Sequence, residues 1–270
     1  MTHVQVLTWP PLALKMLHAL DRIESRFSLA SALKWLDDYR WLSVGVSALY
    51  LLLLYAGKRW MRDKPAFNYR RTLVAWNAGL AVFSMVGVSH FLPPLLESFR
   101  RGGIIQTVCY WPISVSPPFA LWVFLFTISK VVELGDTAFI VLRKTPLTFL
   151  HWYHHVTTLL YAWNSLPSLP AIGHWFGGMN FFIHSIMYSY YTVKASGRYS
   201  VPSWVAQCIT TLQLSQFIFG LLFNLLAFLV KNSGEECMLT DFVFYSGMAL
   251  YGSYALLFLN YFYHRYIKKQ

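Results

Sequence analysis

Long apolar stretches alternate with short polar or proline-containing segments along most of this chain. Each stretch has about 20 residues, enough for a helix to cross a lipid bilayer. Prolines fall near the ends of the stretches, where they interrupt a helix at the least cost. The pattern predicts an all-α polytopic membrane protein with seven transmembrane helices. Their expected ranges are 41–57, 72–92, 118–142, 147–164, 171–193, 202–230 and 241–263.

Residues 1–40 have a different pattern, in which Leu, Trp and Phe are mixed with Lys, Arg and Asp. Such a mixture is typical of a helix that lies in the membrane interface. We therefore expect 1–40 to be a peripheral or interfacial segment. Neither an internal repeat nor a long linker divides the rest of the sequence, so residues 1–270 are predicted to form a single domain.

The charge distribution predicts the orientation of the chain in the membrane. Only 12% of the residues are charged, and the net charge is +11. The connections after the first, third, fifth and seventh spans carry thirteen Lys and Arg residues, whereas the other connections and the N-terminal segment carry eight. Because basic loops stay in the cytosol, we expect a lumenal N-terminus and a cytosolic C-terminus. The excess charge suits anionic lipid headgroups, and no basic–aromatic pattern indicates a nucleic-acid partner.

The three cysteines are expected in two different environments. Cys109 and Cys237 both fall in predicted non-cytosolic loops, where an oxidising lumen would allow a disulfide between them. Two free thiols are the alternative. Cys208 lies inside the sixth span and is a candidate nucleophile, although a buried cysteine without a positive neighbour usually behaves as a small apolar residue.

Polar side chains inside the spans are rare, and in membrane proteins they usually have a function. Counted from the cytosolic end of each span at about 1.5 Å per residue, most of them here lie roughly 9–14 Å deep. Helices that run in opposite directions therefore place polar groups in one layer, which indicates one site. The layer comprises Lys130, Glu133, Asp136, His151, His154, His155, Asn180, His184, Tyr188, Tyr191, Gln213 and Gln216.

Some of these residues also have a simpler interpretation. Lys130 and Glu133 could be a buried ion pair, and the glutamines could link helices by hydrogen bonds. His90 and His174 are expected to be packing residues. The spacing of His151, His154 and His155 puts them on one helical face, where imidazoles could bind a metal or act as nucleophile or base.

Four segments in this layer resemble the signature boxes of the eukaryotic fatty-acid elongases, the very-long-chain 3-oxoacyl-CoA synthases. They are KVVELGDT, FLHWYHH, NFFIHSIMYSYY and TTLQLSQF, in the family's order and spacing. The resemblance covers roughly residues 40–265. With its tryptophan, the HWYHH box resembles that of the subgroup that acts on saturated and monounsaturated long-chain acyl-CoA.

The resemblance implies a fold in which the second to seventh helices surround a narrow acyl-chain tunnel, in the endoplasmic reticulum membrane. It also implies the condensation of acyl-CoA with malonyl-CoA to a 3-oxoacyl-CoA two carbons longer, with release of CO₂ and CoA. No cofactor and no bound metal are expected. The reductases and the dehydratase of the elongation cycle are expected partners, and a homodimer is one expected oligomeric state.

The resemblance assigns roles to the polar layer. His154 would take the acyl group from CoA, and His184 would carry a proton or act as a second reactive imidazole. His151 and His155 would orient neighbours or bind the thioester and the malonyl carboxylate. Supporting or substrate-binding roles fall to the remaining members, Lys130, Glu133, Asp136, Asn180, Tyr188, Tyr191, Gln213 and Gln216.

Two other classes of protein remain open at this point. A membrane di-iron desaturase or hydroxylase would use the histidines as ligands, but it needs about eight of them, and the chain has nine histidines in total, several near its ends. A seven-helix receptor or transporter fits the orientation but not the buried histidine face. The ending YIKKQ also departs from the family's dilysine retrieval signal, which has lysines third and fourth from the terminus.

Overall fold

The computed structural model describes residues 23–112 and 115–268, and within these ranges all the regular elements are helices. Residues 1–22 of the predicted interfacial segment lie outside the described part. The helices are α2 (Leu29–Asp38), α3 (Arg40–Trp60), α4 (Arg70–Cys109), α5 (Pro117–Glu133), α6 (Asp136–Leu142), α7 (Phe149–Ser165), η1 (Leu166–Ser168), α8 (Gly173–Ser196), α9 (Ser203–Asn232), α10 (Asp241–Phe262) and η2 (Tyr263–Ile267).

Capping residues explain where several of these helices begin and end. The side chains of Ser116, Thr148 and Thr240 each accept a hydrogen bond from a backbone N–H in the first turn of α5, α7 and α10. Such caps satisfy N–H groups that have no partner inside the helix. At the C-terminal end of α8, Gly197 adopts the left-handed conformation, with φ 56°, and terminates the helix.

The second and third predicted spans differ from the observed helices. The second was expected to end at Pro93–Pro94, but α4 continues through both prolines to a kink at Gly102–Gly103, where the backbone angles are not helical. A last helical part follows the kink to Cys109. That expectation was wrong, because two missing backbone donors weaken a helix without necessarily ending it. The third span is divided between α5 and α6. Gly135 lies at the division, where a Cβ atom would be 2.7 Å from the ring of Trp76.

Five helical segments are long and apolar enough to cross a membrane, among the residues that the structure describes. They are Arg40–Trp60, Arg70–Cys109, Pro117–Leu142, Ser203–Asn232 and Asp241–Ile267. The multi-pass membrane character is therefore supported. Helix α7 has only 17 residues, and the 24-residue α8 carries many polar side chains. The very residues that indicate a site thus make these two helices less apolar, and the count of seven spans stays a prediction.

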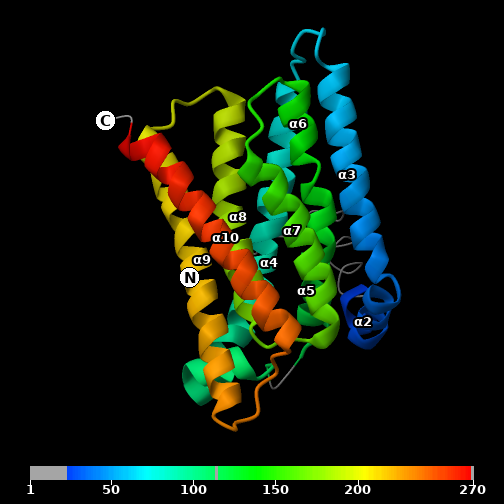
Figure 1. Cartoon of the computed structure of the whole chain (residues 1–270), viewed down its shortest axis with the longest axis vertical. Helices are drawn as coiled ribbons and strands as arrows, with labels where there is room; N and C mark the ends of the chain where they lie inside the picture. Colours follow the sequence, from blue (N-terminus) through cyan, green and yellow to red (C-terminus); the bar gives the residue numbers. More distant parts are fainter. Residues whose placement is uncertain (1–22, 113–114, 269–270) are drawn as a thin grey trace, which may run out of the picture.

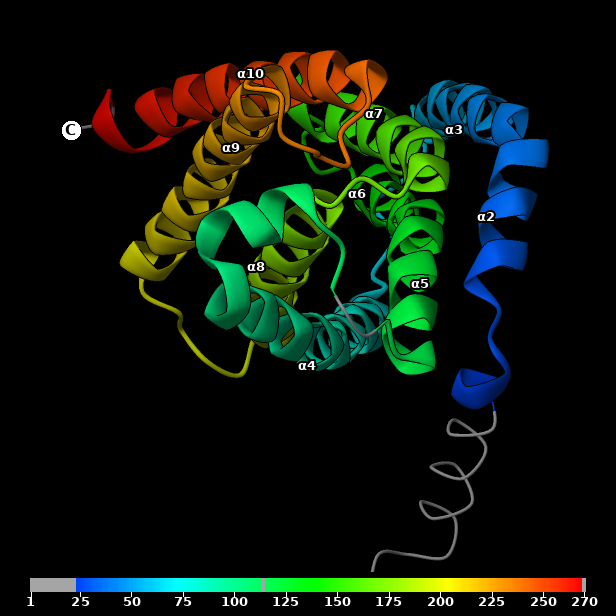
Figure 2. The ribbon, with the colours of Figure 1, turned by 90° about the horizontal axis from the view of Figure 1, so that it is seen from below.

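In the described part of the chain, six helical passes, formed by α4, α5 with α6, α7, α8, α9 and α10, make a closed ring through their contacts. Figure 2 shows this ring from below. Around the ring, α4 packs on α5, α5 on α7, α7 on α10, α10 on α9, and α9 on α8, which returns to α4. Neighbours in the sequence run in alternating directions (Figure 1). Helix α6 continues α5, and α3 lies outside the ring against α6 and α7. These six passes correspond to the second to seventh predicted spans.

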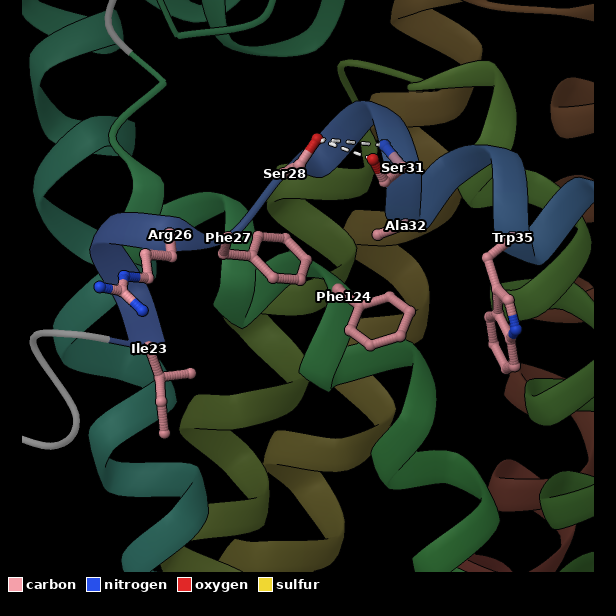
Figure 3. A pocket seen from close by; sticks show the side chains of 8 residues that line it. All are labelled: Ile23, Arg26, Phe27, Ser28, Ser31, Ala32, Trp35 and Phe124. Atoms are coloured by element: carbon pink, nitrogen blue, oxygen red, sulfur yellow. Dashed lines mark hydrogen bonds between the residues drawn. The ribbon is translucent and has the colours of Figure 1, made fainter.

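The N-terminal part of the described chain lies outside the ring. Helix α2 lies beside the N-terminal end of α3 and contacts α5, α7 and η1. Figure 3 shows the shallow groove between this segment and α5, with a volume of about 780 Å³, where Phe27 and Trp35 lie on either side of Phe124. Residues 23–38 therefore pack on the outer surface of the ring, and the interfacial location of 1–40 stays a prediction.

Glycines bring α4 and α8 close together below the polar layer. A Cβ atom on Gly87 would lie 2.6 Å from the ring of Phe181, and one on Gly177 would lie 2.6 Å from the ring of Phe91. The rings of Phe91 and Phe181 also contact each other, with centroids 5.2 Å apart. The α4–α8 contact thus depends on aromatic rings that pack directly against the glycine backbone of the facing helix.

At the end of the molecule opposite the C-terminus, Cys109 and Cys237 lie at disulfide distance, with their Cα atoms 4.3 Å apart. Cys109 ends α4, and Cys237 lies in the connection between α9 and α10. The pairing expected from the predicted topology is therefore geometrically possible.

A candidate active site inside the helix ring

The predicted polar layer lines a cavity of about 270 Å³ inside the ring. Helices α5, α6, α7, α8 and α9 all contribute, so residues that are far apart in the sequence meet in one place. From the predicted set, the lining includes Glu133, Asp136, His151, His154, His155, Asn180, His184, Tyr188, Tyr191, Gln213 and Gln216. Lys130 is not part of the lining.

Lys130 lies behind the cavity wall, in an ion pair with Glu133. Its Nζ donates hydrogen bonds to Oε1 of Glu133, at 2.8 Å, and to Oδ1 of Asn180, at 2.7 Å. The hydroxyl of Ser129 donates to the same carboxylate oxygen, at 3.0 Å. The side chains of Lys130 and Glu133 are only 3% and 6% exposed. This buried pair joins α5 to α8 and fixes the orientation of the Asn180 amide.

The Asn180 amide in turn determines how His184 is protonated. Because Oδ1 of Asn180 accepts from Lys130, its Nδ2 faces Nε2 of His184, at 3.2 Å. An amide nitrogen can only donate, so Nε2 accepts and the ring proton of a neutral imidazole lies on Nδ1. Nδ1 is 3.8 Å from Oε1 of Glu133, close enough for the carboxylate to stabilise that tautomer.

The ring of His154 makes no hydrogen bond to any residue that the structure describes. Its backbone carbonyl, by contrast, accepts from the hydroxyls of Thr158 and Tyr254. The Tyr254 ring packs against the imidazole, with centroids 4.9 Å apart. The backbone of His154 is thus held in place, and its ring nitrogens remain available.

A second, narrower cavity of about 70 Å³ lies below the first, and the two share His154, Asn180, Gln216 and Phe217. Its lining is largely apolar and aromatic, and it extends along α7 to Leu166 of η1 and reaches Leu250 of α10. His154 therefore lies where a polar chamber meets an apolar one. This arrangement suits a substrate with a polar reactive end and an apolar tail.

His151 is anchored by hydrogen bonds, unlike His154. Its Nε2 lies 2.9 Å from the Thr137 hydroxyl, which is 2.8 Å from the hydroxyl of Tyr50 on α3. The rings of His151 and His155 contact each other, with centroids 4.3 Å apart. The three histidines of α7 thus have different surroundings.

No group of three or more His, Cys, Asp or Glu side chains is arranged to hold a metal ion among residues 23–112 and 115–268.

Asp136 connects three helices through its two carboxylate oxygens. Oδ1 accepts from the indole Nε1 of Trp76, at 2.6 Å, and Oδ2 accepts from the hydroxyl of Tyr188, at 2.7 Å. Sequence reasoning missed Trp76, Thr137 and Tyr254. An indole N–H inside a span needs an acceptor, and this signal could have found Trp76.

Residues 35–270 match the ELO family, described as the GNS1/SUR4 family. The chain belongs to the ELO family. Among curated relatives, it is 39% identical to very long chain fatty acid elongase 6 of Drosophila melanogaster over 87% of this chain and 75% of that protein. It is 37% identical to very long chain fatty acid elongase 6 of Gallus gallus, over 91% and 92% of the two chains. It is 38% identical to very long chain fatty acid elongase 3 of Mus musculus, over 87% and 86%.

Membership of the ELO family places this enzyme in fatty-acid elongation. Its four signature segments contribute to the two connected cavities or support their walls. His90 and His174, which were expected to be packing residues, are absent from the cavity lining. His174 lies 2.8 Å from the carbonyl oxygen of Phe91, and His90 stacks on Trp122. Cys208, the alternative nucleophile, is exposed rather than buried and is also absent from the lining.

Gln213 and Gln216 reach the cavity from α9 in different ways. Gln216 is buried and lines both cavities. The amide of Gln213 donates to the Met187 sulfur, at 3.2 Å. A thioether is a weak acceptor, so the Gln213 amide loses little when it turns to a substrate oxygen.

Proposed function

We propose that this ELO-family enzyme catalyses the condensation step of elongation, in which a long-chain acyl-CoA and malonyl-CoA form a 3-oxoacyl-CoA two carbons longer. His154 is the nucleophile. The observation that carries the proposal is the imidazole of His154, which makes no hydrogen bond with the described residues and lies at the junction of a polar chamber and an apolar one. A thioester at this junction would have its acyl tail in the apolar cavity and its CoA arm toward the polar end.

In the first half-reaction, a nitrogen of neutral His154 attacks the thioester carbonyl carbon. A carbon–nitrogen bond forms, the carbon–sulfur bond breaks, and CoA leaves as a thiol with the proton lost from the imidazole. The product is an acyl-imidazole, which stays as reactive as a thioester. Because the ring of His154 has no hydrogen-bond partner among residues 23–112 and 115–268, the attack on the thioester breaks no hydrogen bond to them.

In the second half-reaction, malonyl-CoA loses CO₂, and the electron pair of the broken carbon–carbon bond forms an enolate. The enolate carbon attacks the acyl-imidazole carbonyl, the carbon–nitrogen bond breaks, and His154 leaves and regains a proton. One proton is consumed overall. We assign its delivery to His184, because this imidazole lines the same cavity as His154.

The remaining members of the layer support this reaction. The amides of Asn180 and Gln213 are donors for the developing enolate or oxyanion. Tyr188, Tyr191 and Gln216 complete the cavity lining. His151 and His155 bind or orient the thioester and the malonyl carboxylate. Lys130, Glu133 and Asp136 hold the helices and the imidazoles in register.

The proposed setting is the endoplasmic reticulum membrane, with seven spans, a lumenal N-terminus, a cytosolic C-terminus and an acyl tunnel between the helices of the ring. The excess of Lys and Arg at the end of the bundle that carries the C-terminus supports this orientation. The reaction needs no cofactor beyond the two substrates. The 3-oxoacyl-CoA product is the substrate of the cycle's first reductase, and the dehydratase and the second reductase act on the compounds that follow. These enzymes are therefore the proposed partners, and the enzyme would act as a monomer or a homodimer.

The test is a mass-spectrometric assay of purified enzyme with palmitoyl-CoA and malonyl-CoA. Wild type should form the 3-oxoacyl-CoA that is two carbons longer, and His154→Ala should form none. Cys208→Ala is the matched control and should retain activity, since Cys208 is exposed and outside the cavity lining. If folded wild type made no product across a range of acyl lengths, the proposal would fail, and bound iron would be measured next.

A further inference from the structure

Helix α3 lies outside the ring, yet one of its side chains is linked to the wall of the His154 chamber. The hydroxyl of Tyr50 on α3 lies 2.8 Å from Oγ1 of Thr137 on α6. The same oxygen lies 2.9 Å from Nε2 of His151 on α7. Two consecutive hydrogen bonds therefore join a helix outside the ring to a histidine that lines the cavity.

The face of α3 that meets the ring is polar, although most of its surface is apolar and exposed. Its buried residues are Ser43, Ser47 and Tyr50, whose spacing of four and three places them on one face. The Ser43 hydroxyl accepts a hydrogen bond from the amide of Asn164 on α7, at 3.2 Å. Tyr50 is only 7% exposed, whereas the next residue, Leu51, is 38% exposed. The Tyr50 hydroxyl is thus turned to the protein and held there.

The number of available protons determines the direction of the two hydrogen bonds. Each hydroxyl has one proton, and the described part of the chain offers the Tyr50 hydroxyl no partner other than Thr137. If His151 donated to Thr137, Thr137 would donate to Tyr50, and the buried phenolic proton would have no acceptor. If Tyr50 donates to Thr137, Thr137 donates to His151 and both hydroxyl protons are used. Because an unpaired buried donor is costly, the second direction is favoured.

This direction fixes the tautomer of His151. A neutral imidazole carries one ring proton, so an accepting Nε2 requires the proton to be on Nδ1. Nδ1 of His151 has no hydrogen-bond partner among residues 23–112 and 115–268. The side chain lines the same chamber as His154, so this N–H is a donor available to a substrate oxygen.

We propose that Tyr50 is a positioning residue for the condensation, an inference that rests on the proposed function. Through Thr137 it keeps the proton of His151 on Nδ1. That N–H donates to the acyl oxygen as negative charge develops there during the attack by His154. His151 precedes His154 by three residues, which places both on one face of α7. Helix α3 thus supports the reaction although none of its residues lines the chamber.

The first test reads the tautomer without turnover. Solid-state NMR of the purified full-length enzyme in lipid bilayers, with ¹⁵N-labelled histidine, would identify the His151 signals by their loss in His151→Gln. Wild type should show a protonated Nδ1 and an unprotonated Nε2. Tyr50→Phe and Thr137→Val should both shift the signals toward a proton on Nε2, because the donor to Nε2 is weakened or removed. Tyr55→Phe, at a 67% exposed position on the same helix, is the matched control and should leave them unchanged.

The second test measures whether the tautomer matters for the reaction. Tyr50→Phe should lower kcat about fivefold, as expected for one weakened hydrogen bond. The KM for palmitoyl-CoA should stay within about twofold, because the donor acts on charge that develops in the transition state. Thr137→Ser keeps the hydroxyl and should retain most of the activity, whereas Thr137→Val should not. Tyr50→Phe/Thr137→Val should be no slower than Thr137→Val alone, because both changes act through the same hydrogen bond.

Each outcome decides for or against this role of Tyr50. A proton on Nε2 of His151 in wild type would overturn the proposal, and so would a changed tautomer in Tyr50→Phe with unchanged kcat. An equal loss of kcat in Tyr55→Phe would also overturn it. If Tyr50→Phe did not fold, Thr137→Val and Thr137→Ser would give the same comparison. If the tautomer shifted as expected but wild type formed no 3-oxoacyl product, the proposed condensation would fail, and control of the His151 tautomer by Tyr50 would stand.

Discussion

The buried ion pair behind the cavity gives a sharp prediction for Lys130→Met. Methionine has a similar length but no charge, so the variant removes both hydrogen bonds of Nζ, to Glu133 and to Asn180. The Glu133 side chain is 6% exposed, and after the change its carboxylate would keep only the Ser129 hydroxyl as a hydrogen-bond donor. Removal of one partner of a buried ion pair lowers stability by about 3–5 kcal/mol, because the other charge is left buried and unpaired. We expect a loss of this size in the free energy of unfolding.

The double variant Lys130→Met/Glu133→Gln should recover most of that loss. With both charges removed, the remaining cost is about 1–2 kcal/mol, because the hydrogen bonds to Asn180 and Ser129 are still changed. The non-additivity of the cycle measures the pair itself. Lys34→Met, at an exposed position on α2, is the control and should leave stability unchanged.

The assay is unfolding by sodium dodecyl sulfate in mixed micelles, followed by tryptophan fluorescence, for wild type, both single variants and the double variant. A loss below about 1 kcal/mol for Lys130→Met would refute the reasoning, because the pair would then not be buried as the structure places it. A double variant destabilised by the sum of the two single changes would also refute it.

Three further outcomes test other parts of the structure. Gly87→Ala should lower the free energy of unfolding by about 1–3 kcal/mol in the same assay, because its Cβ would lie 2.6 Å from a buried phenylalanine ring. The control Gly79→Ala, whose Cβ would have nothing within 4 Å, should not destabilise the protein. Equal effects of the two variants would contradict the α4–α8 packing. Cys109→Ser should lower stability by about 2–4 kcal/mol under oxidising conditions and not after reduction, and intact-mass analysis of wild type should find the Cys109–Cys237 bridge. Cys208→Ala should keep kcat within about twofold of wild type, since the thiol is exposed and does not belong to the cavity lining. An inactive, folded variant would make Cys208 the nucleophile.

Depth along each predicted span was enough to find the polar layer. Counting residues from the cytosolic ends placed His154 and His184 at similar depths and Gln216 a little deeper, and the structure brings all three to one cavity. The count works because the rise per residue of a helix is fixed, whichever direction the helix runs. It could not give the hydrogen bonds, which depend on the rotation of each helix about its axis.

The same limits explain what the sequence did not reveal. Pro93–Pro94 are typical of a helix end, yet packing carries α4 on to Cys109. Trp76 forms a hydrogen bond with Asp136, and Thr137 forms one with His151, each on another helix. No local sequence pattern identifies such contacts between helices. Lys130 belonged to the right layer, but only the structure shows that it points at Glu133 behind the wall rather than into the cavity.

Trapping the acyl group on His154 tests the central claim most directly. The purified enzyme would be incubated with palmitoyl-CoA alone, digested and analysed by peptide mass spectrometry. The account predicts a palmitoyl adduct on His154, release of an equal amount of CoA, and loss of the adduct when malonyl-CoA is added. An enzyme that turns over but carries the acyl group on another residue, or on none, would contradict it.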